Sequence, residues 1–440
     1  MRYAEELPCA KRKRLHVVLA LSVVLVAMGL SLWPIVRAPI EPPAPPFTVN
    51  DVSQLNPIQV SAVITPTTTL EIIDAVRDHA GPISIGGARH SMGGQIATEG
   101  ALHIDMRQFN KIRVFSPAAR TITVQAGTTW RQIQEAIDPA NLSVTVMQSY
   151  ANFTVGGSLS VNGHGRYVGL GPLVRSVKSL SVILADGSLV DASPNEHSEI
   201  FYGVIGGYGG LGVITEATLT LSDNVPVKRH SDIMPVTAYH HYFFDRIRGQ
   251  PGPLFHNGNI FPDDFGTVRA VTYSSTEEPV TVSDRLRRND RSYGLNRLAF
   301  WIQTEWPFGK WIERRVIDPI YFAGEPVTWR NYEASYDVAE LEPASRRTTT
   351  YLLQEYFVPV ERFDEFVPKM REVLQRHQVN VVNISIRHAI KDPGTLLAWA
   401  RTEVFAFVLY YKQATSEDAQ KETGTWTREL IEDALAIGGS

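Results

Sequence analysis

The sequence predicts an α+β protein in which an N-terminal apolar segment precedes a body of two domains. Residues 50–222 alternate strand-like and helix-like stretches and contain a βαβ pattern. Residues 223–440 combine amphipathic helices with long apolar strands, which is typical of an α+β domain with a mainly antiparallel sheet. The 440 residues suffice for two or three domains, and the small net charge of −4, without a basic stripe in the body, argues against a nucleic-acid partner.

The N-terminal apolar segment, residues 15–36, contains no Asp, Glu, Lys or Arg and follows the basic cluster of residues 11–14. A run of roughly 20 apolar residues crosses a bilayer as a helix, and its positive flank stays in the cytoplasm. We therefore expect residues 1–14 to be a cytoplasmic tail, residues 15–36 a single-pass membrane anchor, and the body to lie outside the cytoplasm. A cleaved signal peptide is the alternative for residues 15–36.

The spacer that follows, residues 37–49, is rich in proline and is expected to be extended. The only cysteine, Cys9, lies before the apolar segment, so the chain forms no internal disulfide. A body without cysteine is compatible with an oxidising compartment.

The first domain opens with the βαβ pattern. Strands are predicted over residues 58–66 and 82–87, and a helix over residues 67–81. Thr67 or Thr68 is expected to cap this helix, and Gly81 to end it. Its apolar stripe is predicted to consist of Leu70, Ile73 and Val76.

The rest of the body continues the alternation. A helix over residues 128–138 is predicted to bury Trp130, Ile133 and Ile137, and a hairpin over residues 179–193 to turn at Asp186 and Gly187. Strands are expected at 121–127, 212–222, 381–389 and 402–412, with a domain boundary near 221–226 and a helix over 360–378 that Pro368 kinks or restarts.

Three glycine clusters fall in the first domain, at residues 86–94, 154–169 and 206–214. Glycine lets backbone N–H groups approach a ligand closely, and successive N–H groups form concave anion sites that suit a diphosphate. A nicotinamide fingerprint does not fit residues 163–169, because the glycines that follow would break the helix that this motif requires. The phosphate loop with G-K-[ST] is absent from the sequence.

Four stretches resemble, in order, the PCMH-type FAD-binding domain of the vanillyl-alcohol oxidase flavoproteins. They are ISIGGARHSMGGQ, TVGGSLSVNGHG, LSVILADGSLVDAS and FYGVIGGYGGLGVITEATLTL. That group includes aldonolactone oxidases such as D-arabinono-1,4-lactone oxidase, alditol oxidases, cytokinin dehydrogenases and decaprenylphosphoryl-ribose oxidases. The resemblance implies an FAD-binding domain of two α/β subdomains over residues 50–222 and a substrate-binding cap domain over 223–440. Members usually continue past the point where this chain stops, so a cap truncated at its C-terminus is expected.

The resemblance implies FAD as the cofactor and no metal. It assigns the diphosphate to the loop after the second strand, the flavin and ribityl chain to two later segments, and the adenine or ribityl side to a fourth. In that order, the residues are Ile85, Gly86, Gly87, Ala88, Arg89, His90, Ser91 and Met92; Thr154, Val155, Gly156 and Gly157; Val161, Asn162, Gly163 and His164; and Gly212 and Val213.

His90 has a special place in this resemblance, because several members with His-Ser at this position carry FAD covalently on the histidine. An imidazole is a nucleophile near neutral pH, which suits such a bond. The alternative is a histidine that only hydrogen-bonds a phosphate or a carbonyl. Arg89 is expected to pair with a phosphate or to be solvated.

Four residues of the second domain are candidates for catalysis. Glu355 lies between apolar neighbours on a predicted strand, where burial perturbs a carboxyl pKa. Arg387 shares a strand face with Asn383 and Ser385, and such a polar face suits a hydroxyl-rich ligand. His388 and Lys412 complete the set, and a solvated or ion-paired surface role is the alternative for each of the four.

The resemblance predicts an FAD-dependent oxidase or dehydrogenase that oxidises a CH–OH group of a sugar alcohol, aldonolactone or related polyol by hydride transfer to flavin N5. Oxygen or a membrane electron acceptor would reoxidise the flavin. Two alternatives stay open: oxidation of a lipid-linked sugar, as in the decaprenylphosphoryl-ribose oxidases, and a binding protein that keeps the fold without catalysis.

Overall fold

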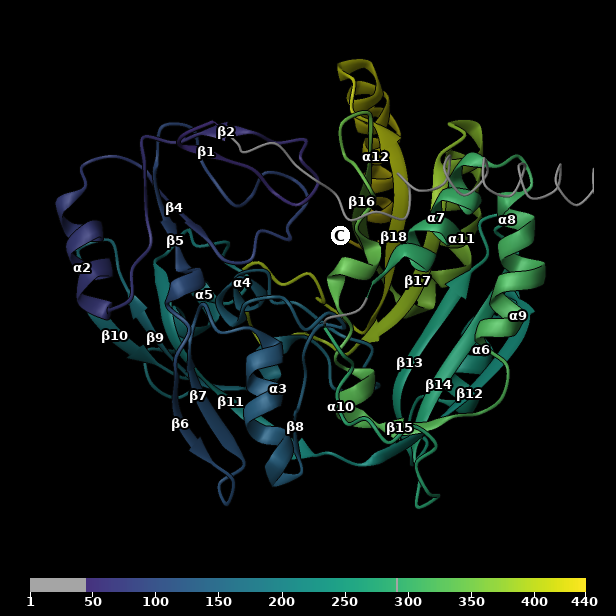
Figure 1. Ribbon diagram of the computed structural model, residues 1–440, viewed down its shortest axis with the longest axis horizontal. Helices are drawn as coiled ribbons and strands as arrows, with labels where there is room; N and C mark the ends of the chain where they lie inside the picture. Colours follow the sequence, from purple (N-terminus) through teal and green to yellow (C-terminus); the bar gives the residue numbers. More distant parts are fainter. Residues whose placement is uncertain (1–44, 290–291) are drawn as a thin grey trace, which may run out of the picture.

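The computed structural model describes residues 45–289 and 292–440 and divides them between two sheet-based halves that lie side by side (Figure 1). The predicted tail and apolar segment, together with residues 37–44 of the spacer, lie outside these described residues. Within residues 45–289 and 292–440, no helix has the length and apolar character that crossing a membrane requires.

The first half begins with a small parallel sheet that contains the predicted βαβ unit. Strand β3 (Ala62–Ile64) and strand β4 (Ile83–Gly86) both pair with β5 (Leu102–Asp105) in parallel, and helix α2 (Thr69–Asp78) connects β3 to β4. A short antiparallel pair, β1 (Thr48–Val49) and β2 (Ile58–Gln59), precedes it.

The apolar face of helix α2 differs in part from the prediction. Thr68 caps the helix as expected, because its hydroxyl accepts a hydrogen bond from the Glu71 N–H. The stripe prediction was wrong for Leu70, which is 63% exposed, whereas Ile72 and Val76 are buried. Ile72 and Val76 are four residues apart and share one helix face, which points at the sheet.

The second part of the first half combines an antiparallel sheet with three helices. Its order is β10 (Leu189–Ala192), β9 (Val177–Ile183), β11 (Val213–Asp223), β7 (Thr121–Gln125) and β6 (Ile112–Ser116), and β8 (Leu142–Val144) pairs with β11. The β9–β10 hairpin confirms the predicted turn, in which Gly187 has φ of 80°. The helices are α3 (Trp130–Ile137), α4 (Val155–Ser160) and α5 (Ser198–Val204). Trp130, Ile133 and Ile137 are fully buried, as predicted.

The second half confirms the predicted antiparallel sheet. It has seven strands: β15 (Val327–Trp329), β12 (Pro226–Pro235), β14 (Thr267–Ser275), β13 (Pro253–Ile260), β17 (Asn380–Ala389), β18 (Val404–Ala414) and β16 (Thr349–Pro359). Strand β16 is an edge strand, and Figure 1 shows it beside the first half. The side chains that β16 presents to the first half therefore help to form any site between the two halves.

Helices cover this sheet. They are α6 (Val236–Arg246), α7 (Gly294–Glu305), α8 (Gly309–Ile312), α9 (Asp318–Tyr321), α10 (Arg330–Glu333), α11 (Phe363–Arg376) and α12 (Glu417–Ala436). Helix α11 buries Phe363, Phe366 and Met370 as its spacing predicts, and it runs through Pro368 without a restart. Pro368 is exposed, so water can satisfy the carbonyl that loses its helical partner.

Candidate functional site

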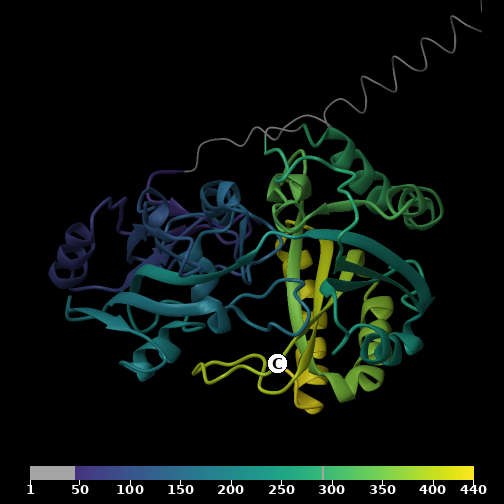
Figure 2. The same cartoon turned by 90° about the horizontal axis from the view of Figure 1, so that it is seen from below.

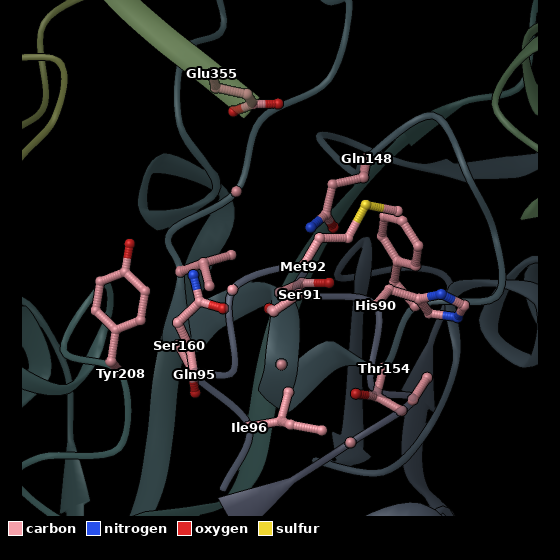
Figure 3. Close-up of a pocket in the computed structure, with 18 of the residues that line it drawn as sticks. His90, Ser91, Met92, Gln95, Ile96, Gln148, Thr154, Ser160, Tyr208 and Glu355 are labelled. Carbon is pink, nitrogen blue, oxygen red and sulfur yellow. The ribbon is translucent and has the colours of Figure 1, made fainter. Parts of the chain in front are cut away.

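A cavity of about 670 Å³ lies between the glycine-rich segments of the first half and strand β16 of the second. Figure 3 shows Glu355 entering it from β16, on the side opposite Ile96 and Thr154. Its volume falls within the range of roughly 300–1,000 Å³ that is usual for ligand pockets. Most of the residues singled out from the sequence line it: Ile85, Gly87, Ala88, Arg89, His90, Ser91, Met92, Thr154, Gly156, Gly157, Val161, Gly163, His164, Gly212, Glu355 and Arg387.

The remaining candidates do not line the cavity. Gly86 belongs to β4, and Val155 and Val213 lie in the hydrophobic core. Asn162 is buried and donates to Asp392 at 2.8 Å. The other two, His388 and Lys412, are held by partners elsewhere in the second half.

Two of the glycines allow the cavity wall to close. A Cβ on Gly87 would collide with the Thr154 hydroxyl, and a Cβ on Gly156 would lie 2.8 Å from the Ala126 Cβ. The loop after β4 therefore packs directly against the N-terminus of α4, and the absence of side chains leaves backbone atoms at the cavity surface.

The loop after β4 also offers unpartnered backbone donors. None of the N–H groups of residues 88–92 donates a hydrogen bond to another described residue. Arg89 has φ of 61°, in the left-handed region, within this run. Successive N–H groups that include a left-handed residue form a concave anion site, so the loop fits the diphosphate of a dinucleotide.

Arg89 is not solvated, contrary to one of the two expectations for it. Its guanidinium donates to the Asp105 carboxylate at 3.0 Å, and Arg107 donates to the same carboxylate. The Arg89 Nε atom is buried and has no hydrogen-bond partner among the described residues. Arg89 thus stiffens the start of the loop and keeps one donor available.

His90 is held as a neutral imidazole. Its ring lies 4.7 Å from the Phe153 ring, between centroids. Burial, assisted by the positive charge of Arg346, lowers its pKa to about 4. The buried Nδ1 atom has no hydrogen-bond partner among the described residues. A neutral imidazole with an unpartnered nitrogen at a cavity wall can accept a hydrogen bond or act as a nucleophile.

Glu355 and His164 form a hydrogen-bonded pair across the two halves. His164 Nε2 lies 3.1 Å from Glu355 Oε2, and His164 Nδ1 lies 3.2 Å from the Gly165 carbonyl oxygen. The imidazole is thus held between a backbone carbonyl of the first half and a carboxyl group of the second.

Arg387 places a third charged group at the cavity. Burial lowers the pKa of the Arg387 guanidinium. Its Nε atom has no hydrogen-bond partner among the described residues. Burial alone would raise the pKa of Glu355, but the charges of His164 and Arg387 outweigh it and lower that pKa. The carboxylate form of Glu355 is therefore favoured beside a half-buried guanidinium whose Nε atom is unpartnered.

His388 and Lys412 have structural partners. His388 Nε2 lies 2.6 Å from Glu403, and its ring packs 4.9 Å from the Phe243 ring, between centroids. Lys412 forms an ion pair with Glu305. Adjacent strand residues point to opposite sheet faces, which explains why Arg387 reaches the cavity and His388 does not.

Several cavity residues were not identified from the sequence, including Gln148, Tyr208 and Trp399. Tyr208 lies inside the third glycine cluster and has φ of 53°, so the cluster itself was a usable signal. Trp399 packs against Phe357 with ring centroids 4.3 Å apart. No local pattern marks Gln148 or Trp399, because only the tertiary fold brings them to the cavity.

Comparison with known proteins locates the cofactor domain. Residues 60–193 match the family described as FAD binding domain. The chain is 31% identical over 183 residues to cytokinin dehydrogenase 2 of Arabidopsis thaliana, covering 40% of this chain and 36% of that protein. It is 30% identical over 167 residues to an alditol oxidase of Streptomyces sp., covering 38% and 40%.

A third relative is an uncharacterised oxidoreductase, ORF5 of the fasciation locus of Rhodococcoides fascians. It is 32% identical over 164 residues, which cover 36% of this chain and 37% of the relative. The matches thus span well under half of each relative. The family match, the unpartnered N–H groups of residues 88–92 and the cavity volume agree, and the cofactor of this domain is FAD.

Proposed function

We propose that the protein is an FAD-dependent oxidoreductase that oxidises a CH–OH group of a small polyhydroxylated molecule, such as a sugar alcohol or an aldonolactone. The observation that carries the proposal is the placement of Glu355, His164 and Arg387 at the cavity that the glycine-rich segments line. The relative named alditol oxidase supports this substrate class. The cytokinin dehydrogenases are similar to this chain to the same extent. The choice of substrate class therefore rests on the residues of the second half.

The loop of residues 85–92 would hold the diphosphate of FAD through its unpartnered N–H groups. The glycines of residues 156–163 and Gly212 would line the rest of the cofactor. When bound, FAD supplies a hydride acceptor for the oxidised carbon. We also propose that His90 bonds the flavin covalently, because its neutral imidazole and unpartnered Nδ1 meet the requirement for a nucleophile. The imidazole nitrogen would replace one hydrogen of the 8α carbon, with protons released and two electrons passed to the proposed electron acceptor.

In the proposed reaction, the Glu355 carboxylate accepts the proton of the substrate hydroxyl. Its Oε2 atom is held by His164, which leaves Oε1 to face the substrate. His164 is a positioning residue, since its Nδ1 is anchored on the Gly165 carbonyl and its Nε2 fixes the carboxylate. General-base assistance of this kind contributes roughly 10²–10⁴-fold in rate.

Arg387 would stabilise negative charge that develops on the substrate oxygen. A half-buried guanidinium whose Nε atom has no hydrogen-bond partner gains from any anionic or hydroxyl oxygen placed before it. Tyr208 and Gln148 add neutral hydrogen-bonding groups to the cavity wall. Such a set of charged and neutral donors suits a ligand with several hydroxyl groups.

The proposal also includes the membrane anchor, the extracytoplasmic location of the body, and oxygen or a membrane carrier as the electron acceptor. Only the sequence supports these three parts.

The test is anaerobic reduction of the FAD-loaded full chain by a panel of alditols, aldonolactones and aldoses, with amines as the comparison class. Loss of the flavin absorbance with a CH–OH donor supports the proposal. Reduction by amines alone would exclude the substrate class. Failure to bind FAD at all would favour the non-catalytic binding protein.

A further inference from the structure

The helical segment between β14 and β15 exposes a dense set of large apolar side chains. Seven of the nineteen strongly exposed large apolar side chains in the described part of the chain lie within residues 295–321. Phe308 is 73% exposed and Ile320 71%. We call this surface the helical patch; its members are Leu295, Trp306, Phe308, Trp311, Val316, Ile320 and Tyr321.

Other residues of the same segment pack against the sheet. Phe300 on α7 lies against the rings of Tyr351 and Tyr410, with centroids 6.3 and 6.2 Å apart. Gln303 donates to the Val382 carbonyl at 2.7 Å. The segment is therefore fixed on the sheet by these residues, while the members of the helical patch stay exposed. Exposed apolar patches of this kind usually mark an interaction surface.

Cations accompany the helical patch. Lys310 and Arg315 form no ion pair with any described residue. Glu305 pairs with Lys412, and Asp318 pairs with the buried Arg269. The third acidic residue of the segment, Glu313, has no hydrogen-bond partner for its buried Oε2 among the described residues, and burial raises its pKa to about 7. Tryptophan, other large apolar side chains and unpaired cations together are typical of surfaces that enter the interfacial layer of a bilayer with anionic lipids.

We propose that the helical patch docks on a lipid bilayer, with its aromatic and aliphatic side chains in the interface and Lys310 and Arg315 at the headgroups. This inference rests on the proposed membrane anchor and does not depend on the reaction that the protein catalyses.

The N-terminal sequence supports a bilayer as the surface that the helical patch contacts. The apolar residues 15–36 are followed by only the short stretch of residues 37–44 before the described body begins. At about 3.1 Å per residue, an extended proline-rich chain of that length reaches roughly 25 Å. Figure 2 shows the start of the body, in purple, and the green α7–α9 segment toward its upper edge. A membrane held at that distance would face the helical patch.

A second copy of the chain is the competing occupant. Most homodimers pair the same surface on both copies. Such pairing would bring Arg315 of each copy near that of the other, and Arg315 forms no ion pair with a described residue; the charge of Lys310 is offset in part by Asp263. The bilayer is therefore the occupant that the charges favour.

The experiment uses the full chain in vesicles of phosphatidylcholine and phosphatidylglycerol. The single cysteine is removed by Cys9→Ser, and one cysteine is introduced by Phe308→Cys or Ile320→Cys for an environment-sensitive fluorophore. Leu396→Cys is the matched control, because Leu396 is 72% exposed. It lies in the loop between β17 and β18, which Figure 2 shows in yellow-green at the lower edge, away from α7–α9.

We expect the labels at positions 308 and 320 to shift to shorter emission wavelengths and to be quenched by spin-labelled lipid. The label at 396 should keep the emission of a label in water. Equal, water-like emission at all three positions would overturn the proposal. So would energy transfer between labels on different copies at positions 308 and 320 without quenching by lipid, which would identify a second copy as the occupant.

Discussion

The Glu355 carboxylate, on the edge strand of the second half, lies 3.1 Å from Nε2 of His164, in the loop that follows α4 of the first half. The two residues are 191 positions apart in the sequence. Their contact joins the two halves at the cavity, and the other imidazole nitrogen of His164 lies 3.2 Å from the Gly165 carbonyl oxygen. The chemical proposals depend on this contact.

Glu355→Gln should reduce turnover by about 10²–10⁴-fold while FAD remains bound, because an amide cannot accept the substrate proton. The measurement is the rate of flavin reduction in single-turnover experiments, together with the flavin content of the purified variant. Glu365→Gln is the control, since Glu365 lies on the exposed side of α11 and pairs with Arg362. Normal flavin reduction in Glu355→Gln would remove Glu355 from the mechanism.

Arg387→Met should move the acid limb of the kcat/KM profile to higher pH. The charge of Arg387 helps to lower the pKa of Glu355, so its removal raises that pKa and the carboxylate is lost at a higher pH. Arg371→Met, at an exposed position of α11, should leave the profile unchanged. An unchanged acid limb in Arg387→Met would show that Arg387 does not act on the carboxylate.

His90→Ala should convert a covalently bound flavin into a dissociable one. After acid precipitation, the pellet of the unmodified chain should fluoresce, and the flavin of His90→Ala should appear in the supernatant. Ser91→Ala, which changes the adjacent cavity residue, should behave like the unmodified chain. If the unmodified chain already releases its flavin into the supernatant, the histidine serves only as a hydrogen-bonding group.

Lys412→Gln should leave turnover unchanged and lower the free energy of unfolding by on the order of 1 kcal/mol, because its observed role is an ion pair with Glu305. Urea unfolding and steady-state kinetics measure the two effects separately. A large loss of turnover with normal stability would return Lys412 to the set of catalytic candidates.

Part of this arrangement was predictable because it is local. The βαβ unit, the buried face of α3 and the antiparallel sheet follow from periodic apolar patterns that extend over a few residues. Of the 18 residues that the sequence analysis assigns to the cofactor, 14 line one cavity, and their role in binding stays a prediction. Such patterns reflect the local conformational preferences of the backbone, and these preferences agree with the folded structure.

The remainder depends on contacts between distant segments. Nothing near His164 in the sequence indicates that Glu355 will reach it. Arg387 and His388 are neighbours in the sequence, and no local pattern distinguishes their roles. They lie on opposite faces of β17, and only the face with Arg387 adjoins the cavity. Leu70 was assigned to the buried stripe of α2 because apolar spacing alone does not show where the stripe ends.

The free energy of unfolding should fall as the pH decreases from 7 to 5. Burial lowers the pKa of His90 and His103 to about 4 and of His256 to about 3. In the unfolded chain these groups bind protons below about pH 6.5, whereas the folded chain binds them only near pH 4, so acid favours unfolding by up to about 1.4 kcal/mol per pH unit for each. His230 and His377, whose pKa values are raised by hydrogen bonds to carboxylates, act in the opposite direction but at exposed or solvent-screened sites.

Urea unfolding at pH 5, 6 and 7 checks this expectation, and His103→Gln should flatten the dependence by removing one of the three groups. Equal stability at pH 5 and 7, with no difference between the two chains, would contradict burial of neutral histidines.

The most direct test of the account is the absorption spectrum of the FAD-loaded full chain, recorded without oxygen before and after addition of a sugar alcohol or an aldonolactone. We predict that the flavin bands disappear with at least one such compound and persist in Glu355→Gln. Flavin bands that survive every CH–OH donor in the unmodified chain would contradict the proposed reaction.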